Sequence, residues 1–191
     1  NDLADKGGLP VDQQTRWFGR ENPKDTQAYQ HANFEERLQW VKDGIRNGEV
    51  CGTIAQVYFA LPEDERDVFL EGQIQAVHFT PLGLCIHDFA IDPCPYYLNC
   101  ARKCPEYLRT KGNQQERTNL IQVQRRTKQS LEIAQAQAAS GKGETAQAWI
   151  QHYEETLVGV EAALAIDDDP TVSDGTMVQP FKGHPSRFQP L

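Results

Sequence analysis

Apolar residues recur at intervals of three and four along most of the chain, which predicts a mainly α protein. The pattern is strongest over residues 113–139 and 145–165, where it forms a heptad-like seam. The polar stretch SGKGE separates the two segments, so they predict an antiparallel helical hairpin whose apolar stripes bury each other. The seam positions are Leu120, Val123, Thr127, Leu131, Ala134 and Ala138 in the first helix, and Ala146, Ile150, Tyr153, Leu157, Val160 and Leu164 in the second.

Shorter patterned segments precede the hairpin. Residues 9–18 predict a short helix and residues 26–47 a longer one, each followed by a glycine that favours a helix end. Residues 53–60 are apolar enough for a buried strand or a buried helix, and periodicity does not decide between them. After Pro62 the acidic stretch EDERDVFLEGQIQAV predicts another helix.

Two regions lack this periodicity. Residues 79–112 are rich in proline, glycine and cysteine and predict a small loop-rich unit. The tail, residues 166–191, contains the run DDDP followed by further prolines and glycines, and it predicts extended chain.

Charge is spread unevenly along the chain. The chain carries 19 Lys and Arg against 27 Asp and Glu, and its net charge of −8 argues against a simple polyanion binder. Residues 85–130, however, carry 8 basic against 4 acidic residues, whereas residues 1–84 and 131–191 are each at −6. The basic surplus thus coincides with the Cys-rich region and the beginning of the hairpin.

The apolar runs bear on localisation. They are far shorter than the roughly 20 residues that a membrane-spanning helix needs. The N-terminal stretch NDLADKGG also lacks the charged-then-apolar pattern of a signal peptide. We therefore expect a soluble, cytoplasmic protein with no membrane partner.

Four of the five cysteines fall within 20 residues, in the stretch CIHDFAIDPCPYYLNCARKC. In a cytosolic chain such clustering favours a metal site over disulfides. Four thiolates fill the tetrahedral shell of a structural zinc ion, so the predicted ligands are Cys85, Cys94, Cys100 and Cys104. A loop-rich unit of about 30 residues is hard to hold by apolar burial alone, which supports a zinc staple.

Two alternatives concern the same stretch. His87, two residues after Cys85, can replace one cysteine or hold a ligand by hydrogen bonding. The cysteines can also be reduced side chains buried in a small core, because free cysteine is often buried.

The stretch FGRENPKDTQAYQHA, residues 18–32, is too polar for a core but contains a tyrosine. A tyrosine hydroxyl attacks a phosphodiester only when cationic or hydrogen-bonding neighbours activate it. Arg20 lies at a turn, Thr26 is placed to cap the next helix, and Tyr29 falls in the first turn of that helix. The stretch therefore predicts a nucleophilic Tyr29; the alternative is a surface tyrosine on an amphipathic helix.

On these residues the chain resembles the tyrosine recombinase (phage integrase) family. The segment GGLPVDQQTRWFGRENPKDTQAYQH matches the family pattern at Gly8, Leu9, Trp17, Gly19, Thr26, Tyr29 and His31. The resemblance implies that Tyr29 forms the 3′-phosphotyrosyl bond during DNA cleavage. Arg20 stands where the family usually has a second catalytic His or Trp, so it can donate to a phosphate but cannot carry a proton.

The downstream run HFTPLGLCIHDFAIDPC, with the Cys-rich stretch and the hairpin after it, is similar to the C-terminal extension of large integrases of bacterial genomic islands. The matching positions are Thr80, Gly83, Cys85, His87, Asp88 and Phe89. Together the two resemblances cover most of residues 7–165. They imply a bacterial, nucleoid-associated protein of a mobile genetic element.

The recombinase family also requires an upstream arginine, a lysine on a β-hairpin and an H-x-x-R box, and none precedes Asn1. The resemblance therefore predicts the C-terminal part of a recombinase that is inactive alone. Its expected partners are double-stranded DNA, the upstream part of the same enzyme and other protomers.

Eight basic side chains in residues 85–130 are candidates for phosphate contacts. They are Arg102, Lys103, Arg109, Lys111, Arg117, Arg125, Arg126 and Lys128. For those on the helix, the alternative is an ordinary solvated face. The second hairpin helix is acidic, which fits contact with a protein better, so the alternative function is a zinc-stabilised protein interaction module with a structural Tyr29.

The predicted architecture thus combines C-terminal helices of a recombinase catalytic domain, a small loop-rich zinc-binding unit and an antiparallel helical hairpin. Its parts are residues 1–50 (the catalytic-domain segment), 51–78 (a connecting helical segment), 79–112 (the zinc-binding unit), 113–165 (the hairpin) and 166–191 (the extended tail).

Overall fold

The structure, a computed structural model, describes residues 10–17, 19, 21, 34–140 and 143–181. It is mostly helical with a small mixed sheet, which confirms the prediction of a mainly α protein in its coarse form. The chain forms two units, Asn1–Gln39 and Trp40–Leu191. In the first unit, the predicted short helix is present as α2, Val11–Trp17.

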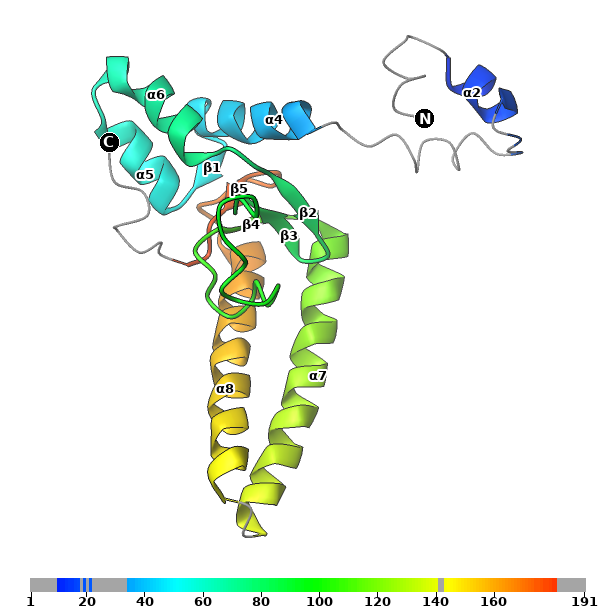
Figure 1. Cartoon of the computed structure of the whole chain (residues 1–191), viewed down its shortest axis with the longest axis vertical. Coiled ribbons are helices and arrows are strands. Elements are labelled where there is room, and N and C mark those ends of the chain that lie inside the picture. Colours follow the sequence, from blue (N-terminus) through cyan, green and yellow to red (C-terminus); the bar gives the residue numbers. More distant parts are fainter. Residues whose placement is uncertain (1–9, 18, 20, 22–33, 141–142, 182–191) are drawn as a thin grey trace. The chain divides into compact units, whose positions relative to one another are not determined.

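The second unit combines helices with a five-stranded sheet (Figure 1). From the second described helix onwards the elements are α4 (Phe34–Arg46), β1 (Val50–Cys51), α5 (Thr53–Ala60), α6 (Glu63–Gln73), β2 (His78–Thr80), β3 (Gly83–Cys85), β4 (Tyr107–Thr110), α7 (Gln114–Ala139), α8 (Gly143–Ala165), the 3₁₀ helix η1 (Ile166–Asp168) and β5 (Met177–Val178). Residues 53–60 are therefore a helix and not a strand.

The helices α5 and α6 share an apolar core with the end of α4. Ile45 of α4, Ile54 of α5 and Leu70 of α6 have no exposed surface. Lys42 of α4, itself almost fully buried, reaches Glu71 of α6 at 2.6 Å. Apolar burial supplies most of the driving force, and the Lys42–Glu71 ion pair joins α4 to α6.

The sheet has the strand order β1-β5-β4-β3-β2. β5 pairs in parallel with β1 and antiparallel with β4, and the remaining neighbours are antiparallel. The region predicted as loop-rich, residues 79–112, therefore contains paired strands, and the tail predicted as extended supplies β5, which lies between β1 and β4. At Gly83, with φ 148°, a side chain would meet the Leu108 carbonyl 2.3 Å away, so β3 and β4 need a glycine there.

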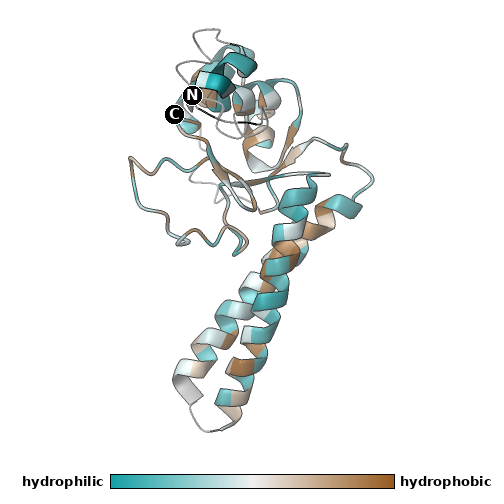
Figure 2. Ribbon diagram, turned by 90° about the vertical axis from the view of Figure 1, so that its right-hand side faces the viewer, coloured by the Kyte–Doolittle hydropathy of each residue, from teal (hydrophilic) through white to brown (hydrophobic). Residues whose placement is uncertain are grey.

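The predicted hairpin is present as α7 and α8 (Figure 1). Its seam is apolar, with Leu120 and Val160 fully buried, while Figure 2 shows hydrophilic residues along much of both helices. α7 begins at a cap in which the Asn113 side chain accepts the N–H groups of Gln115 and Glu116. Such a cap satisfies donors that a helix start leaves open.

Two buried cations connect the base of the hairpin to the sheet. Arg109 of β4 donates to both carboxylate oxygens of Asp167 in η1, at 2.9 and 2.7 Å. Lys111 donates to the carbonyls of Asp169 and Val172. Burial works against the charged form of Asp167, but the Arg109 guanidinium still holds the pKa of this carboxyl below its usual value.

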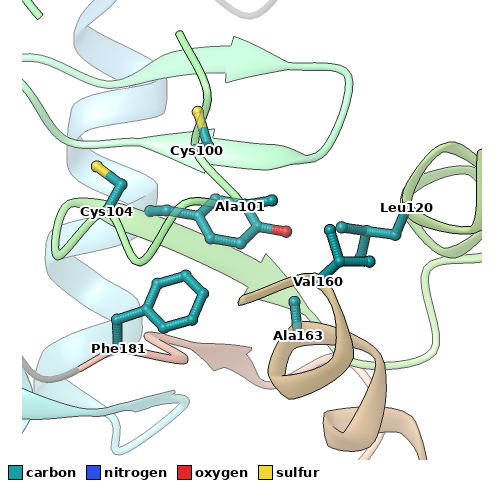
Figure 3. Close-up of a cluster of buried hydrophobic side chains, with 8 residues drawn as sticks. Cys100, Ala101, Cys104, Leu120, Val160, Ala163 and Phe181 are labelled. Atoms are coloured by element: carbon teal, nitrogen blue, oxygen red, sulfur yellow. The ribbon is translucent and has the colours of Figure 1, made fainter. Parts of the chain in front are cut away.

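One apolar cluster joins the sheet, the hairpin and the segment between β3 and β4 (Figure 3). Its members are Cys100, Ala101, Cys104, Tyr107, Leu120, Val160, Ala163 and Phe181. The Cys-rich segment therefore shares a buried core with the sheet and the hairpin.

Candidate metal centre and basic helix face

The four clustered cysteines line one cavity of about 210 Å³. Cys85 ends β3, and the other three lie in residues 86–106, the segment between β3 and β4 that we call the cysteine loop. The other residues lining the cavity are His78, Phe79, Thr80, Pro81, His87, Phe89, Tyr96, Leu98 and Glu106. Folding thus brings to one place thiols that are up to 19 positions apart in the chain.

The side chains are not arranged as a closed ligand shell. Within the described ranges, no three His, Cys, Asp or Glu side chains are grouped closely enough to hold one metal ion. The zinc site therefore stays a prediction. A change of rotamer moves a cysteine sulfur without moving its backbone, so a metal shell here requires the thiols to turn toward one another.

Burial shapes the chemistry of the thiols. Cys85, Cys100 and Cys104 are buried, and Cys94 is half-buried. Loss of water raises the pKa of Cys85 to about 11 and that of Cys104 to about 12, although backbone N–H groups at His87 and Glu106 partly offset the effect. A bound divalent cation reverses this balance, because it favours the thiolate.

The backbone of the cysteine loop is strained. Tyr97, Leu98 and Lys103 have φ of 50°, 63° and 59°, and within the described residues these are all the non-glycine residues with positive φ. The left-handed conformation costs roughly 1–2 kcal/mol for such residues. It persists only where the surroundings fix it, as they do at many ligand sites.

His87 lies beside the thiols, but its ring nitrogens are occupied. Nδ1 is 2.7 Å from Oε2 of Glu106, and Nε2 is 2.9 Å from the carbonyl oxygen of Asp92. The His87 ring is 1% exposed. His87 can therefore replace a cysteine ligand only by breaking one of these bonds. Its two hydrogen-bond partners both lie in the cysteine loop, so its position fits a residue that fixes the loop without binding the metal.

The tyrosine segment carries the predicted catalytic residues. Tyr29 and Arg20 lie outside the described residues, as do Thr26 and His31. Their predicted roles in DNA cleavage therefore remain predictions.

Two of the predicted phosphate contacts are buried side chains with partners inside the protein. Arg109 has no exposed surface and binds Asp167 through two donors, and Lys111 is 8% exposed and donates to two carbonyls. Both side chains point into the protein to fix the hairpin base. They have no exposed charge to offer DNA.

Two other predicted contacts are ion-paired near the surface. Arg102 in the cysteine loop binds Glu155 of α8 at 2.9 Å, and Arg117 of α7 lies 3.4 Å from Asp167. Each side chain is 39% exposed, so a phosphate must compete with the carboxylate. Lys103 is exposed.

The last three predicted contacts form the basic face of α7. Arg125, Arg126 and Lys128 fall within about one helical turn, and all three side chains are exposed. In the part of the chain that the structure describes, none of them forms an ion pair. Of the eight predicted contacts, they are the group best placed to meet a polyanion.

The cysteine loop also packs on α8 at a residue that sequence reasoning missed. A Cβ at Gly159 would lie 1.7 Å from the carbonyl oxygen of Ala101, so the loop rests on bare helix backbone. Nearby, Asn99 donates to the Thr156 hydroxyl at 3.4 Å. A signal for this contact exists in the sequence, because glycine inside a helix costs about 1 kcal/mol relative to alanine and calls for a packing reason.

Comparisons of the chain with protein-family models, with characterised proteins and with solved structures give no match. Among the helices of the described part, none is long and apolar enough to cross a membrane.

Proposed function

We propose that the chain is the C-terminal part of a site-specific DNA recombinase of the tyrosine type, in which a zinc-stapled extension contacts double-stranded DNA. The zinc ion is held by Cys85, Cys94, Cys100 and Cys104. The upstream part of the same enzyme, or another protomer, supplies the remaining catalytic residues. In this proposal the protein works in the cytoplasm of a bacterium, on the DNA of a mobile element.

The observation that carries the DNA contact is the basic face of α7. Arg125, Arg126 and Lys128 are exposed and form no ion pair with any residue that the structure describes, on a protein whose net charge is −8. An acidic protein that groups uncompensated cations on one helix turn has a local surface suited to phosphate. The net charge itself repels DNA, which confines contact to this face.

The support for the metal is the shared cavity. Four thiols line about 210 Å³, three of them in a loop with three strained residues, and such a segment gains stability from a bound ion. A zinc ion there has four protein ligands and no open position, so its role is structural.

The catalytic part of the proposal concerns Tyr29 and Arg20. The Tyr29 oxygen attacks the scissile phosphorus, the bond from phosphorus to the 5′ oxygen breaks, and the 5′ strand leaves as a free hydroxyl that takes up the proton given up by the tyrosine. Tyr29 is then joined to the 3′ phosphate, and Arg20 donates to a phosphate oxygen during this step. The chain alone should form no covalent adduct with a nicked duplex. An adduct that appears when the upstream part is added, and disappears in Tyr29→Phe, is the expected result.

The DNA contact is tested by fluorescence anisotropy of a labelled duplex, with the zinc-loaded protein over a range of salt. The triple change Arg125→Gln, Arg126→Gln, Lys128→Gln should weaken binding and reduce the slope of log K against log salt by up to about 3, since each phosphate contact contributes about 0.9. Absent or salt-insensitive binding by the unaltered protein would remove the DNA role.

A control separates contact from global charge. Glu154→Gln with Glu161→Gln removes two exposed negative charges from α8. It should strengthen binding slightly at low salt and leave the salt slope unchanged. If it changes the slope as much as the α7 variant, the basic face is not the contact.

A zinc-stabilised protein interaction module is the second candidate. Ile133 and Trp149 are 60% and 51% exposed, and each precedes a seam residue by one position. In an antiparallel pair this offset turns both side chains to the same side of the hairpin. Light scattering of the purified protein tests self-association, and Ile133→Ser with Trp149→Ser should abolish any oligomer formed through this side.

A further inference from the structure

We infer that occupancy of the thiol site fixes the α7–α8 hairpin in place, because the cysteine loop clamps α8 at the bare backbone of Gly159. The inference rests on the proposed zinc site and adds a coupling between that site and the hairpin that carries the basic face.

The clamp consists of neighbouring contacts between the loop and α8. The carbonyl of Ala101 lies over Gly159, closer than any side chain there would permit. Asn99 donates to Thr156 on one side of it. Arg102 binds Glu155 at 3.0 and 2.9 Å on the same helix.

These clamp residues are placed by the cysteines. Ala101 directly follows Cys100, and Cys104 follows three residues later. Cys100, Ala101 and Cys104 belong to the same buried cluster as Val160 and Ala163 of α8 (Figure 3). An ion that holds Cys100 and Cys104 therefore also holds the backbone between them against the helix.

Without an ion the loop is held by its apolar packing in the buried cluster and by one backbone bond that joins its ends, from Ile86 to Glu106. Its other backbone hydrogen bonds close short turns, such as Asn99 to Tyr96 and Cys104 to Cys100. Lys103, which directly follows Arg102 of the clamp, has a left-handed backbone. When the ion leaves, we expect this segment to relax away from α8.

The hairpin keeps its other supports when that happens. Arg109 and Asp167 still join its base to the sheet, and Asn119 of α7 still donates to the Pro81 carbonyl. When the ion leaves, the hairpin therefore loses only the contacts between the cysteine loop and α8. Since linkage is reciprocal, a clamp that favours the DNA-binding arrangement makes zinc bind more tightly when DNA is bound, by the same factor that zinc strengthens DNA binding.

Hydrogen–deuterium exchange on the whole chain tests the clamp directly. Zinc content is measured first, and exchange is then compared before and after chelation. We expect zinc removal to speed exchange in the cysteine loop and in residues 155–163, and to leave residues 146–152 of the same helix unchanged. Stoichiometric zinc with no change in residues 155–163 would overturn the inference while leaving the metal site intact.

A chain that binds no zinc would overturn both the metal site and the clamp. The DNA role stands apart from these readouts. Failure to bind DNA, with zinc-dependent protection of α8 preserved, would overturn the proposed function and not the clamp.

Gly159→Ala gives the sharpest signature, because its effect should change sign with zinc. In the zinc-free protein the released helix gains a better helix former, so the melting temperature should rise. In the zinc-loaded protein the new Cβ displaces Ala101, so zinc affinity should fall about tenfold, within the range typical of such couplings. A variant that raises the melting temperature in both states, with unchanged zinc affinity, contradicts the clamp.

A matched control and a milder variant accompany it. Ala162→Ser adds one heavy atom at an exposed position of the same helix and should leave zinc affinity unchanged. Thr156→Val keeps the shape but removes the acceptor for Asn99, and it should weaken zinc binding by roughly threefold. If Gly159→Ala does not fold with zinc, Thr156→Val decides, and unchanged zinc affinity in it counts against the clamp.

Discussion

In the hairpin, the backbone groups bond within each helix, and two seams of apolar side chains hold α7 against α8. In the cysteine loop, the backbone closes short turns, passes through three left-handed residues and buries the thiols of Cys100 and Cys104. The hairpin thus satisfies its polar groups locally, whereas the loop depends on side chains and neighbours. A substitution in one region should therefore leave the fold of the other region unchanged, except where the loop contacts α8.

The largest expected effect is on the loop. Cys104→Ser removes a ligand of the proposed zinc shell, so bound zinc should fall from one per chain to none, and the melting temperature should fall by roughly 10 °C. Helicity measured by circular dichroism should fall little before melting, because the hairpin is held by its own seam. Elemental analysis and thermal melts measure both quantities, and Cys51→Ser, which alters an exposed cysteine, is the control.

The converse change acts on the hairpin. Ile150→Ala removes a buried seam side chain far from the loop and should cost about 3 kcal/mol of unfolding free energy in urea. Zinc affinity should stay unchanged. Val158→Ala, at a position 53% exposed, should cost less than about 0.5 kcal/mol. A loss of zinc binding in Ile150→Ala would show that the two regions are less independent than their contacts imply.

The hairpin base is the third test. Asp167→Asn leaves the Arg109 charge buried without its partner and should cost about 3 kcal/mol. Asp168→Asn, one residue along and exposed, should be nearly neutral.

The same pair predicts a pH dependence. Because the folded-state pKa of Asp167 is lowered from 3.8, its stabilisation is present above that value and is lost as the pH falls through the lower folded value. The stability difference between the unaltered protein and Asp167→Asn should therefore shrink in acid. Urea unfolding at a series of pH values checks it, and a difference that stays constant below about pH 4 contradicts this reading.

The smallest effect concerns the first turn of α7. Asn113→Ala removes the acceptor for two backbone N–H groups and should cost about 1 kcal/mol. Thr118→Ala, exposed on the same helix, should change stability by less than about 0.5 kcal/mol. Equal effects of the two would mean that the helix start is not held by this cap.

The same contrast explains what the sequence predicted. The hairpin was predictable because a repeated seam such as Leu120 to Ala134 carries its own period. The strands β2, β3 and β4 were missed because they have three or four residues, and β3 is buried throughout, so no alternation marks them.

The candidate site was predictable only in part. The four cysteines line one cavity, as their short spacing in the chain allows, whereas their binding of a zinc ion stays a prediction. Arg109 was predicted as a phosphate contact because its partner, Asp167, lies 58 residues away in the chain. No residue near Arg109 in the sequence indicates that this side chain is buried in an ion pair. Gly159 was passed over because its contact with Ala101 is equally remote in the chain.

The position of β5 has a consequence for the order in which the chain can fold as it is synthesised. β5 lies between β1 and β4 and pairs with both. The strands β1 and β4, which are synthesised earlier, can therefore be joined into one sheet only after residues 177–178 have been made. Until then a nascent chain presents two open strand edges beside a hairpin that is already able to form. A ribosome that stalls between α8 and β5 would hold this protein in its most association-prone form.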